Sequence, residues 1–267
     1  MSIDANEESS GEDQKPARDK PKHTSEPVHQ GVLADNVKTI GYALLIALFI
    51  RIFLFQPFNI PSASMKPNLL VGDYLFVSKY AYGFSRHSFP FSPAIFGGRI
   101  FASQPERGDV IVFKFPPDGR TDYIKRLIGM PGDTVQMVDG VLHINGRLIR
   151  RERVDDFIDI DKYGRLTTIP QFREYLPNGV SYTTLDSRNS STDNTSVFSV
   201  PQGHYFMMGD NRDNSSDSRL TVGYVPFENL VGQAEVLFYS TDGSAKVWQF
   251  WNWFSAMRWQ RFFTSVQ

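Results

Sequence analysis

Two short segments of this sequence carry residue types that could perform nucleophilic chemistry. Ser62 and Ser64 lie in the Pro-bounded stretch PSASM, and Lys125 lies in the stretch DYIKRLIG. In isolation, two serines between prolines indicate a turn, and adjacent Lys and Arg indicate solvated charge. However, the apolar neighbours of Lys125 predict a strand that is buried on both faces. Lowering a lysine pKa from about 10.4 to about 8 requires roughly 3 kcal/mol of differential solvation. A neutral lysine is a general base that can accept a proton from a serine hydroxyl.

Other catalytic chemistries lack their residues here. The chain has no cysteine, which excludes a disulfide scaffold, a thiolate zinc site and a cysteine nucleophile. It contains no GxSxG, HExxH or phosphate-loop motif, and its five histidines are scattered. We therefore expect no metal and no organic cofactor, and a Ser/Lys pair is the simplest arrangement. Lys+Arg total 28 and Asp+Glu 29, so no basic excess favours a nucleic-acid partner.

A third segment, GDNRDNSSDSR at 209–219, is dense in Asp, Asn and Ser. Such a composition is typical of a solvated loop. Arg212 and Arg219 could pair with the aspartates of the same loop, because a guanidinium binds carboxylates in a fixed fork. The segment is therefore predicted to be rigid enough to hold a hydroxyl in place.

An apolar stretch precedes these segments and predicts that they lie near a membrane surface. From Thr39 to Phe58 the chain is almost free of charge, and about twenty such residues cross a bilayer as a helix. Arg51, near the end, can extend its guanidinium to the headgroups. We predict a membrane anchor at 34–57 after a disordered cytoplasmic tail at 1–33, with lysines before the span keeping the N-terminus inside. The alternative is a buried core helix. Ser64 follows Phe55 by nine residues and therefore lies within about 30 Å of the membrane exit.

The remainder of the chain has a β pattern. Gly-Asp pairs precede runs rich in Val, Ile and Phe, and Asn145-Gly146 is a hairpin signal. These patterns predict a mainly β fold: an antiparallel β domain at 58–247 with an inserted β subdomain at 139–200. The last segment, 248–267, contains all four Trp and no acidic residue. This composition favours a membrane interface, the alternative being a terminal helix packed on the β domain.

Taken in order, the three segments resemble bacterial type I signal peptidases, a Ser/Lys dyad family. The resemblance rests on PSASMKPNLLVGDYLFVSKYAYG at 61–83, RGDVIVFKFP with DYIKRLIGMPGD at 107–133, and the segment at 209–219. It implies a nucleophile at Ser64, a general base at Lys125, an oxyanion-hole hydroxyl at Ser62, and a serine that orients the base at Ser215. It further implies a supporting ion pair between Asp217 and Arg219. The apolar positions that it implies for the substrate groove are Phe58, Ile60, Leu69, Tyr123 and Ile124.

The resemblance also implies what the protein acts on and where. It implies a membrane-anchored serine endopeptidase that removes signal peptides from exported pre-proteins after small residues, as in Ala-x-Ala. The catalytic domain would lie at the outer face of the cytoplasmic membrane, in contact with phospholipid and near the export machinery. Three alternatives stay open at this point: a specialised peptidase of the same clan, a non-catalytic peptide-binding β module, and a soluble Ser/Lys autoprotease linked to DNA binding. The apolar span argues against the last of these.

Overall fold

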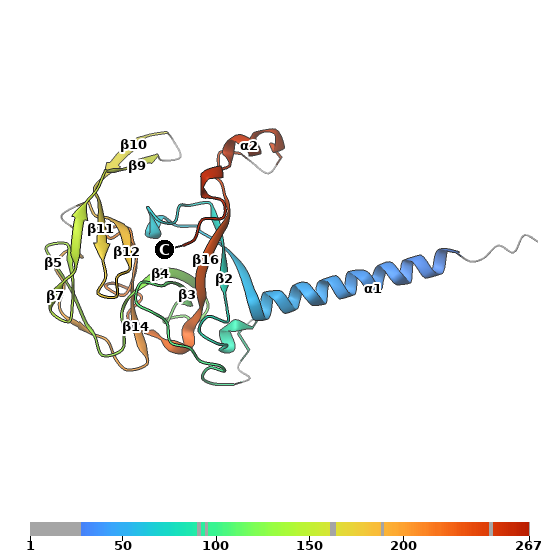
Figure 1. Ribbon diagram of the computed structural model, residues 1–267, viewed down its shortest axis with the longest axis horizontal. Coiled ribbons are helices and arrows are strands. Elements are labelled where there is room, and N and C mark those ends of the chain that lie inside the picture. The colour runs from blue at the N-terminus through green and yellow to red at the C-terminus, as the bar shows by residue number, and fades with distance from the viewer. Residues whose placement is uncertain are drawn as a thin grey trace, which may run out of the picture. The chain divides into compact units, whose positions relative to one another are not determined.

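We analysed a computed structural model of the chain, which describes residues 28–89, 92–93, 96–160, 164–187, 190–245 and 248–266. The predicted tail up to residue 27 and the predicted domain limit at residue 247 lie outside the described residues. The chain forms one compact unit that ends at Leu44 and another that begins at Leu45, and we describe each by itself. Figure 1 shows the elements with their labels.

The apolar segment is helical. Helix α1 spans Val28–Phe49 and continues into a π-helical turn at Ile50–Leu54. Within it, Ala34–Leu54 is a stretch of 21 residues with mean hydropathy 2.0, long and apolar enough to cross a membrane. Among the described residues, none of this stretch is buried, which argues against a core helix. The helix begins at Val28, six residues before the predicted start of the anchor at 34. The helical turns end at Leu54, three residues before the predicted end at 57, because Phe55–Asn59 pair with a neighbouring strand.

The second unit contains a large antiparallel sheet, as the β pattern predicts. Seven strands pair among the described residues, and every pairing is antiparallel. In spatial order they are β1 (Phe55–Asn59), β2 (Asp73–Ser78), β16 (Leu230–Ser240), β3 (Val110–Lys114), β4 (Asp122–Gly129), β14 (His204–Met208) and β15 (Val225–Pro226). The late strand β16 lies between β2 and β3, and Figure 1 shows it running beside β2.

Three smaller sheets are formed by the chain between β4 and β14. Their strands are β5 (Thr134–Val138), β6 (Val141–Ile144), β7 (Arg147–Leu148), β8 (Arg150–Arg153), β9 (Phe157–Ile160), β10 (Leu166–Ile169), β11 (Gln171–Tyr175), β12 (Ser181–Leu185) and β13 (Phe198–Ser199). The insertion predicted at 139–200 covers these sheets except for β5. Asn145 and Gly146 join β6 to β7 with φ of 54° and 72°, the positive values that a tight hairpin turn requires.

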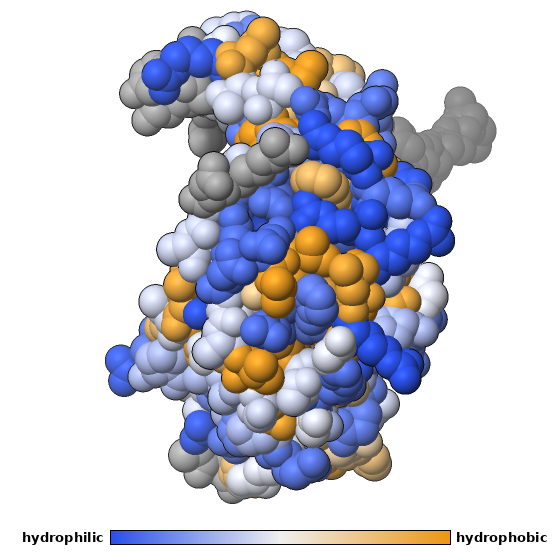
Figure 2. Space-filling view, turned by 90° about the vertical axis from the view of Figure 1, so that its left-hand side faces the viewer, coloured by the Kyte–Doolittle hydropathy of each residue, from blue (hydrophilic) through white to orange (hydrophobic). Residues whose placement is uncertain are grey.

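A continuous apolar core joins the small sheets to the large one. The cluster that connects them contains Ile128 of β4, Val135 and Met137 of β5, Leu142 of β6 and Phe206 of β14. Figure 2 looks at the molecule from the β5 and β7 side and shows mainly hydrophilic residues, with apolar ones gathered in a central patch and near the top. The small sheets therefore cover the large sheet with one surface and present a largely polar surface outward.

The C-terminal segment packs on the β unit through part of its length, and its predicted membrane contact stays a prediction. Its short helix α2 is Trp253–Ala256, and single β-bridges join Met257 and Ser265 to the second unit. Arg261 anchors the segment further through an ion pair of 2.6 Å to the buried Asp73. Its aromatic side chains nevertheless remain exposed, with relative accessibilities from 41% to 78%: Trp248, Phe250, Trp251, Trp253, Phe254, Trp259 and Phe263. The segment is attached to the β sheet through these bridges, Arg261 and the side chains of Phe262 and Val266, and its other aromatic side chains form an exposed surface.

Candidate active site

Ser64 lies in a single 3₁₀ turn, Ala63–Met65, on the connection from β1 to β2. The turn is fixed from the opposite side of the site by Asn211. The Asn211 backbone N–H donates to the Ser64 carbonyl oxygen at 3.0 Å, and its side-chain amide donates to the Ala63 carbonyl oxygen at 3.1 Å. Ser64 itself is buried, with 6% of its surface exposed. Two hydrogen bonds therefore tie the Ser64 turn to the segment that contains Asn211.

Lys125 reaches Ser64 from β4. Its Nζ donates to Ser64 Oγ at 2.7 Å and to the carbonyl oxygen of Ile124 at 3.0 Å. The residues are 61 positions apart in sequence, and the fold brings them into hydrogen-bond contact. Lys125 is 3% exposed, as expected for a lysine in a strand buried on both faces.

Burial sets the electrostatics of this lysine. Removal from water lowers the pKa of Lys125 to about 8, and the more distant carboxylates of Asp217 and Asp210 only partly oppose that effect. Neither carboxylate pairs with Lys125, because each is bound bidentately by an arginine. A lysine with this pKa is partly neutral near pH 8 and can then accept a proton from the serine hydroxyl.

The other two serines of the predicted site differ in their contacts. Ser62 Oγ lies 3.3 Å from Ser64 Oγ, so the two hydroxyl groups are within hydrogen-bond distance of each other. Ser215 Oγ is buried and, among the described residues, has no hydrogen-bond partner. The predicted contact of Ser215 with Lys125 is thus not formed here, and its role as an orienting group stays a prediction.

Gly209 allows the segment at 209–219 to approach Ser64. A Cβ at this position would lie 2.2 Å from Ser215 Oγ and 2.6 Å from the carbonyl oxygen of Ser64. Only a residue without a side chain fits between them. The glycine therefore has a packing reason that sequence analysis missed, although its place at the head of the Asp/Asn-rich segment was the available signal.

The ion pair predicted between Asp217 and Arg219 is present. Arg219 Nε and one terminal nitrogen donate to the two Asp217 oxygens at 3.0 and 2.9 Å, and both residues are buried. Asp217 also accepts the backbone N–H of Gly209 at 3.0 Å. Burial alone would raise the pKa of Asp217, but Arg219 and these hydrogen bonds hold the pKa below its ordinary value. The pair stays charged and braces the segment that contains Ser215.

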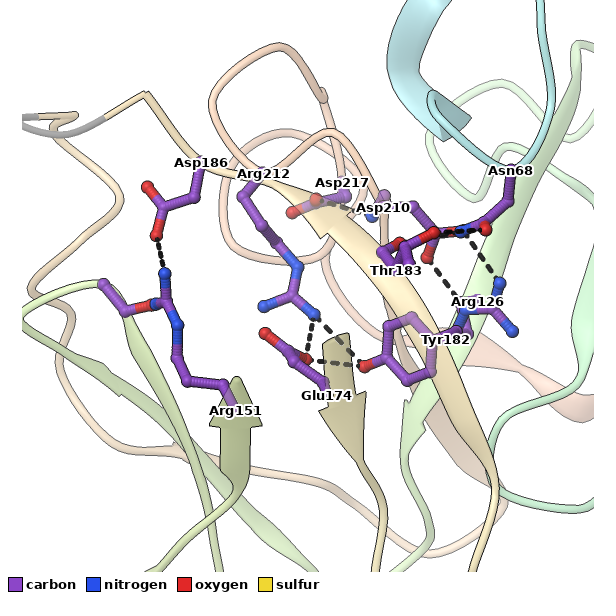
Figure 3. A network of polar contacts seen from close by, with 12 residues as sticks. Asn68, Arg126, Arg151, Glu174, Tyr182, Thr183, Asp186, Asp210, Arg212 and Asp217 are labelled. Carbon is purple, nitrogen blue, oxygen red and sulfur yellow. Dashed lines mark hydrogen bonds and ion pairs between the residues drawn. The ribbon is translucent and has the colours of Figure 1, made fainter. Parts of the chain in front are cut away.

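The partner predicted for Arg212 is wrong. Arg212 does not pair with an aspartate of its own loop but donates to Glu174 of β11 at 2.6 Å, and Tyr182 of β12 shares this contact (Figure 3). All three residues are buried. The reason is that the loop packs against the β11–β12 sheet, where a buried carboxylate must find a cation. The segment at 209–219 is therefore tied to the small sheets and not only to itself.

Sequence analysis also missed a second buried ion pair beside the site. Arg126, next to Lys125 on β4, binds Asp210 with two hydrogen bonds of 2.8 Å, and Asn68 donates to the same carboxylate at 2.7 Å (Figure 3). Consecutive strand residues point to opposite faces, so Lys125 can contact Ser64 while Arg126 contacts Asp210. Arg126 thereby joins the strand of the lysine to the loop that fixes the serine.

A cavity of about 370 Å³ lies over the Ser64–Lys125 pair. Of the predicted substrate-binding residues, Phe58, Tyr123 and Ile124 line it. Ile60 and Leu69 do not line it, since both are buried in the core cluster beneath, at 2% and 1% exposure. Apolar character at those two positions is accounted for by the core.

Candidate metal ligands lie elsewhere. Among the described residues, one group of three carboxylates, Asp186, Asp193 and Asp213, places its oxygens within 4.8 Å of one another. Arg151 already pairs with Asp186 at 2.8 Å, and the backbone N–H of Ser187 donates to Asp213. None of the three residues lines the cavity over Ser64.

Comparison with known proteins decides the family. The profile of the family described as "Signal peptidase, peptidase S26" matches residues 33–239, well over half of the chain. This chain belongs to the signal peptidase family S26. Signal peptidase I of Rickettsia typhi is 46% identical over 210 residues, covering 75% of this chain and 78% of the relative. Signal peptidase I of Rickettsia conorii is 45% identical over 213 residues, covering 76% and 78%.

The family assignment confirms that the protein is a serine peptidase of the signal peptidase I type, and it fits membrane anchoring through the apolar helix. A crystal structure of signal peptidase I from Enterococcus faecalis is 30% identical and covers 49% of this chain and 97% of its own, with a TM-score of 0.30. The exposed aromatic segment of this signal peptidase lies beyond the residues that the family profile matches.

Proposed function

We propose that this signal peptidase removes signal peptides from exported pre-proteins with Ser64 as nucleophile and Lys125 as general base. The observation that supports this assignment best is the 2.7 Å contact between Lys125 Nζ and Ser64 Oγ in a buried site. Nucleophile and base must lie within such a distance, and the base must lose its proton near the working pH. The lowered pKa of Lys125 meets the second condition.

The proposed reaction has two steps. Neutral Lys125 takes the proton of Ser64 Oγ, which attacks the scissile carbonyl carbon, and the protonated lysine then gives that proton to the leaving amine. Water deprotonated by Lys125 hydrolyses the acyl-enzyme and restores both groups. The Ser62 hydroxyl and the Ser64 backbone N–H would donate to the oxyanion, and removing one such donor typically costs a factor of 10² to 10³ in rate. The distance of 3.3 Å between Ser62 Oγ and Ser64 Oγ supports this role for Ser62.

The proposed substrate carries small residues at positions −1 and −3 from the cut. The cavity over the dyad is lined by Phe58 of β1 and by Tyr123 and Ile124 of β4. A substrate strand lying along these residues would turn alternate side chains toward them. We expect the aromatic and β-branched side chains that line the cavity to limit both contacting positions to small residues such as Ala, while −2 would point away.

The proposed location is the outer face of the cytoplasmic membrane. Ala34–Leu54 would serve as the anchor, with the N-terminus in the cytoplasm and the β unit outside, near the export machinery. The exposed aromatic side chains of the last segment, together with Arg258, would contact the phospholipid headgroups. The substrate would thus meet the enzyme at the bilayer surface.

The first test is cleavage of a pre-protein that carries an Ala-x-Ala site. We expect detergent-solubilised wild type to cut it at that site and to cut a matched substrate with Leu at −1 at least 100-fold more slowly. Ser64→Ala should not cut either substrate, whereas Ser199→Ala, a control for an exposed serine on β13, should behave as wild type. Equal cutting by Ser64→Ala would contradict the mechanism. No cutting by folded wild type would instead favour a specialised peptidase with few substrates.

The pH dependence gives a second, independent prediction. The rate kcat/KM is expected to rise about tenfold per pH unit up to about 8 and then level off, because only neutral Lys125 accepts the serine proton. The profile would be measured with the Ala-x-Ala substrate between about pH 6 and pH 10. Lys79, whose pKa burial also lowers to about 8, lies outside this cavity, so Lys79→Met should keep the same profile. A rising limb near pH 4 would point to a carboxylate base and would contradict the assignment.

A further inference from the structure

A second cavity, of about 530 Å³, lies beside the end of the apolar helix. It shares only Asp122 with the cavity over Ser64. Its charged lining consists of the cationic side chains of Arg51, Lys79, Lys114 and Arg120 and the single carboxylate of Asp122. Pockets that bind small ligands commonly have volumes of about 300 to 1,000 Å³. The cavity is large enough for a ligand, and its lining is strongly positive.

The positive charge is only partly neutralised within the protein. Lys114 pairs with Asp122 at 2.8 Å and donates to the carbonyl oxygen of Arg120. In the part of the chain that the structure describes, Arg51, Lys79 and Arg120 have no carboxylate within ion-pair distance. Three cationic groups therefore face one cavity without a counter-ion.

Lys79 is the unusual member of the set. It is 4% exposed, and its ammonium group donates to the carbonyl oxygen of Ser88 at 2.6 Å. Burial, and then the charge of Arg51, lower the pKa of Lys79 to about 8. A buried cation without an anion is costly, and an anion in the cavity would reverse that cost. A lysine ammonium has three donors, so Lys79 retains donors for such a ligand.

We propose that this cavity binds the phosphate group of a phospholipid headgroup. Arginine guanidinium groups bind phosphate oxygens in a fork, and lysine binds them as a point charge. Arg51 belongs to the last turn of the Ala34–Leu54 stretch, so the cavity lies where that stretch ends. Basic pockets at the ends of membrane spans bind lipid headgroups for this reason. The proposal rests on the membrane anchoring proposed above and not on the peptidase mechanism.

The experiment measures lipid binding without turnover, on full-length protein in a non-ionic detergent. Short-chain phosphatidylglycerol is titrated by calorimetry, and two further arms use dihexanoylglycerol, which lacks the phosphate, and inorganic phosphate. We expect phosphatidylglycerol to bind, dihexanoylglycerol not to bind, and inorganic phosphate to bind at least tenfold more weakly. Ser64→Ala protein should give the same result, so failure of the proposed mechanism would not affect this test.

Variants assign the binding to the cavity. Arg120→Gln, outside the helix, is expected to weaken phosphatidylglycerol binding about fivefold, and Arg51→Gln/Arg120→Gln at least tenfold. Arg147→Gln, an exposed arginine on β7, is the matched control and should bind as wild type. Lys79→Met should also weaken phosphatidylglycerol binding. If that variant fails to fold, Arg120→Gln and Arg51→Gln/Arg120→Gln still test the proposal.

Three results would overturn the proposal. Equal binding of dihexanoylglycerol would show that the acyl chains and not the phosphate are recognised. Inorganic phosphate that binds as tightly as the lipid would assign the cavity to a soluble anion. Unchanged lipid binding in Arg51→Gln/Arg120→Gln, with a raised KM for the pre-protein, would assign the cavity to acidic residues of the substrate.

Discussion

Lys125→Met is expected to lower kcat by about 10⁴-fold or more, to the level of Ser64→Ala. Methionine matches the shape of the buried lysine side chain but cannot accept the proton of Ser64 Oγ, the atom that Lys125 Nζ contacts at 2.7 Å. Residues that act as one unit are strongly non-additive, so the double variant should be no slower than either single variant. Single-turnover cleavage of the Ala-x-Ala pre-protein measures all three rates.

The control for this prediction, Lys125→Arg, keeps a positive charge at position 125 but removes the group that can act as a base. Lys125→Arg should be as inactive as Lys125→Met, because a guanidinium stays protonated and cannot serve as the base. Circular dichroism and thermal unfolding should show that all variants remain folded, since no charged partner of Lys125 is left behind. If Lys125→Met retained more than about a tenth of the wild-type rate, Lys125 would not be the general base.

Arg126→Met is expected to destabilise the protein by about 3 to 5 kcal/mol, the range for breaking a buried ion pair by removing one partner. Arg126 is fully buried and binds both oxygens of Asp210, which is 1% exposed. Without the arginine, that carboxylate keeps the Asn68 amide but loses its counter-ion. Denaturant unfolding followed by tryptophan fluorescence measures the change in the free energy of unfolding.

Two further variants separate the charge effect from simple loss of packing. Arg173→Met, an exposed arginine on β11, should change the free energy of unfolding by less than about 0.5 kcal/mol. Arg126→Met/Asp210→Leu should recover much of the loss, because apolar replacements of a whole buried pair are often neutral or stabilising. A cost below about 1 kcal/mol for Arg126→Met alone would mean that Asp210 is compensated by other groups.

Local patterns were sufficient to predict the helix, the antiparallel β class and the hairpin at Asn145-Gly146, because each depends on neighbouring residues. A Ser/Lys pairing could be anticipated because the two motifs offered serine nucleophiles and a buried lysine base, and the family resemblance selected Ser64 from the two serines. Contacts between distant segments could not be anticipated. The alternation of side chains along a strand predicts the face of β4 on which Arg126 lies. It does not predict that Asp210, 84 positions away in sequence, binds Arg126 on that face.

The errors have the same origin. Arg212 was expected to pair within its own loop, and only the packing of that loop on β11 shows that Glu174 is its partner. Ile60 and Leu69 lie in the core and do not line the cavity, so their predicted contact with the substrate stays a prediction, since an apolar residue suits a groove and a core equally well. Sequence composition gives the polarity of a residue's surroundings, whereas its neighbours depend on how the sheets pack.

The position of β16 in the sheet has a consequence for the folding of the enzyme during its synthesis. Strand β16 lies between β2 and β3. Ser64 lies on the connection from β1 to β2, and β3 pairs with β4, the strand that contains Lys125. The chain is made from its N-terminus, so both halves of the site exist before the strand at 230–240 that joins them. Pairing across such long sequence separations is also slow. We therefore expect the serine and the lysine to meet only after residues 230–240 have been synthesised, so that a shorter nascent chain has no assembled dyad.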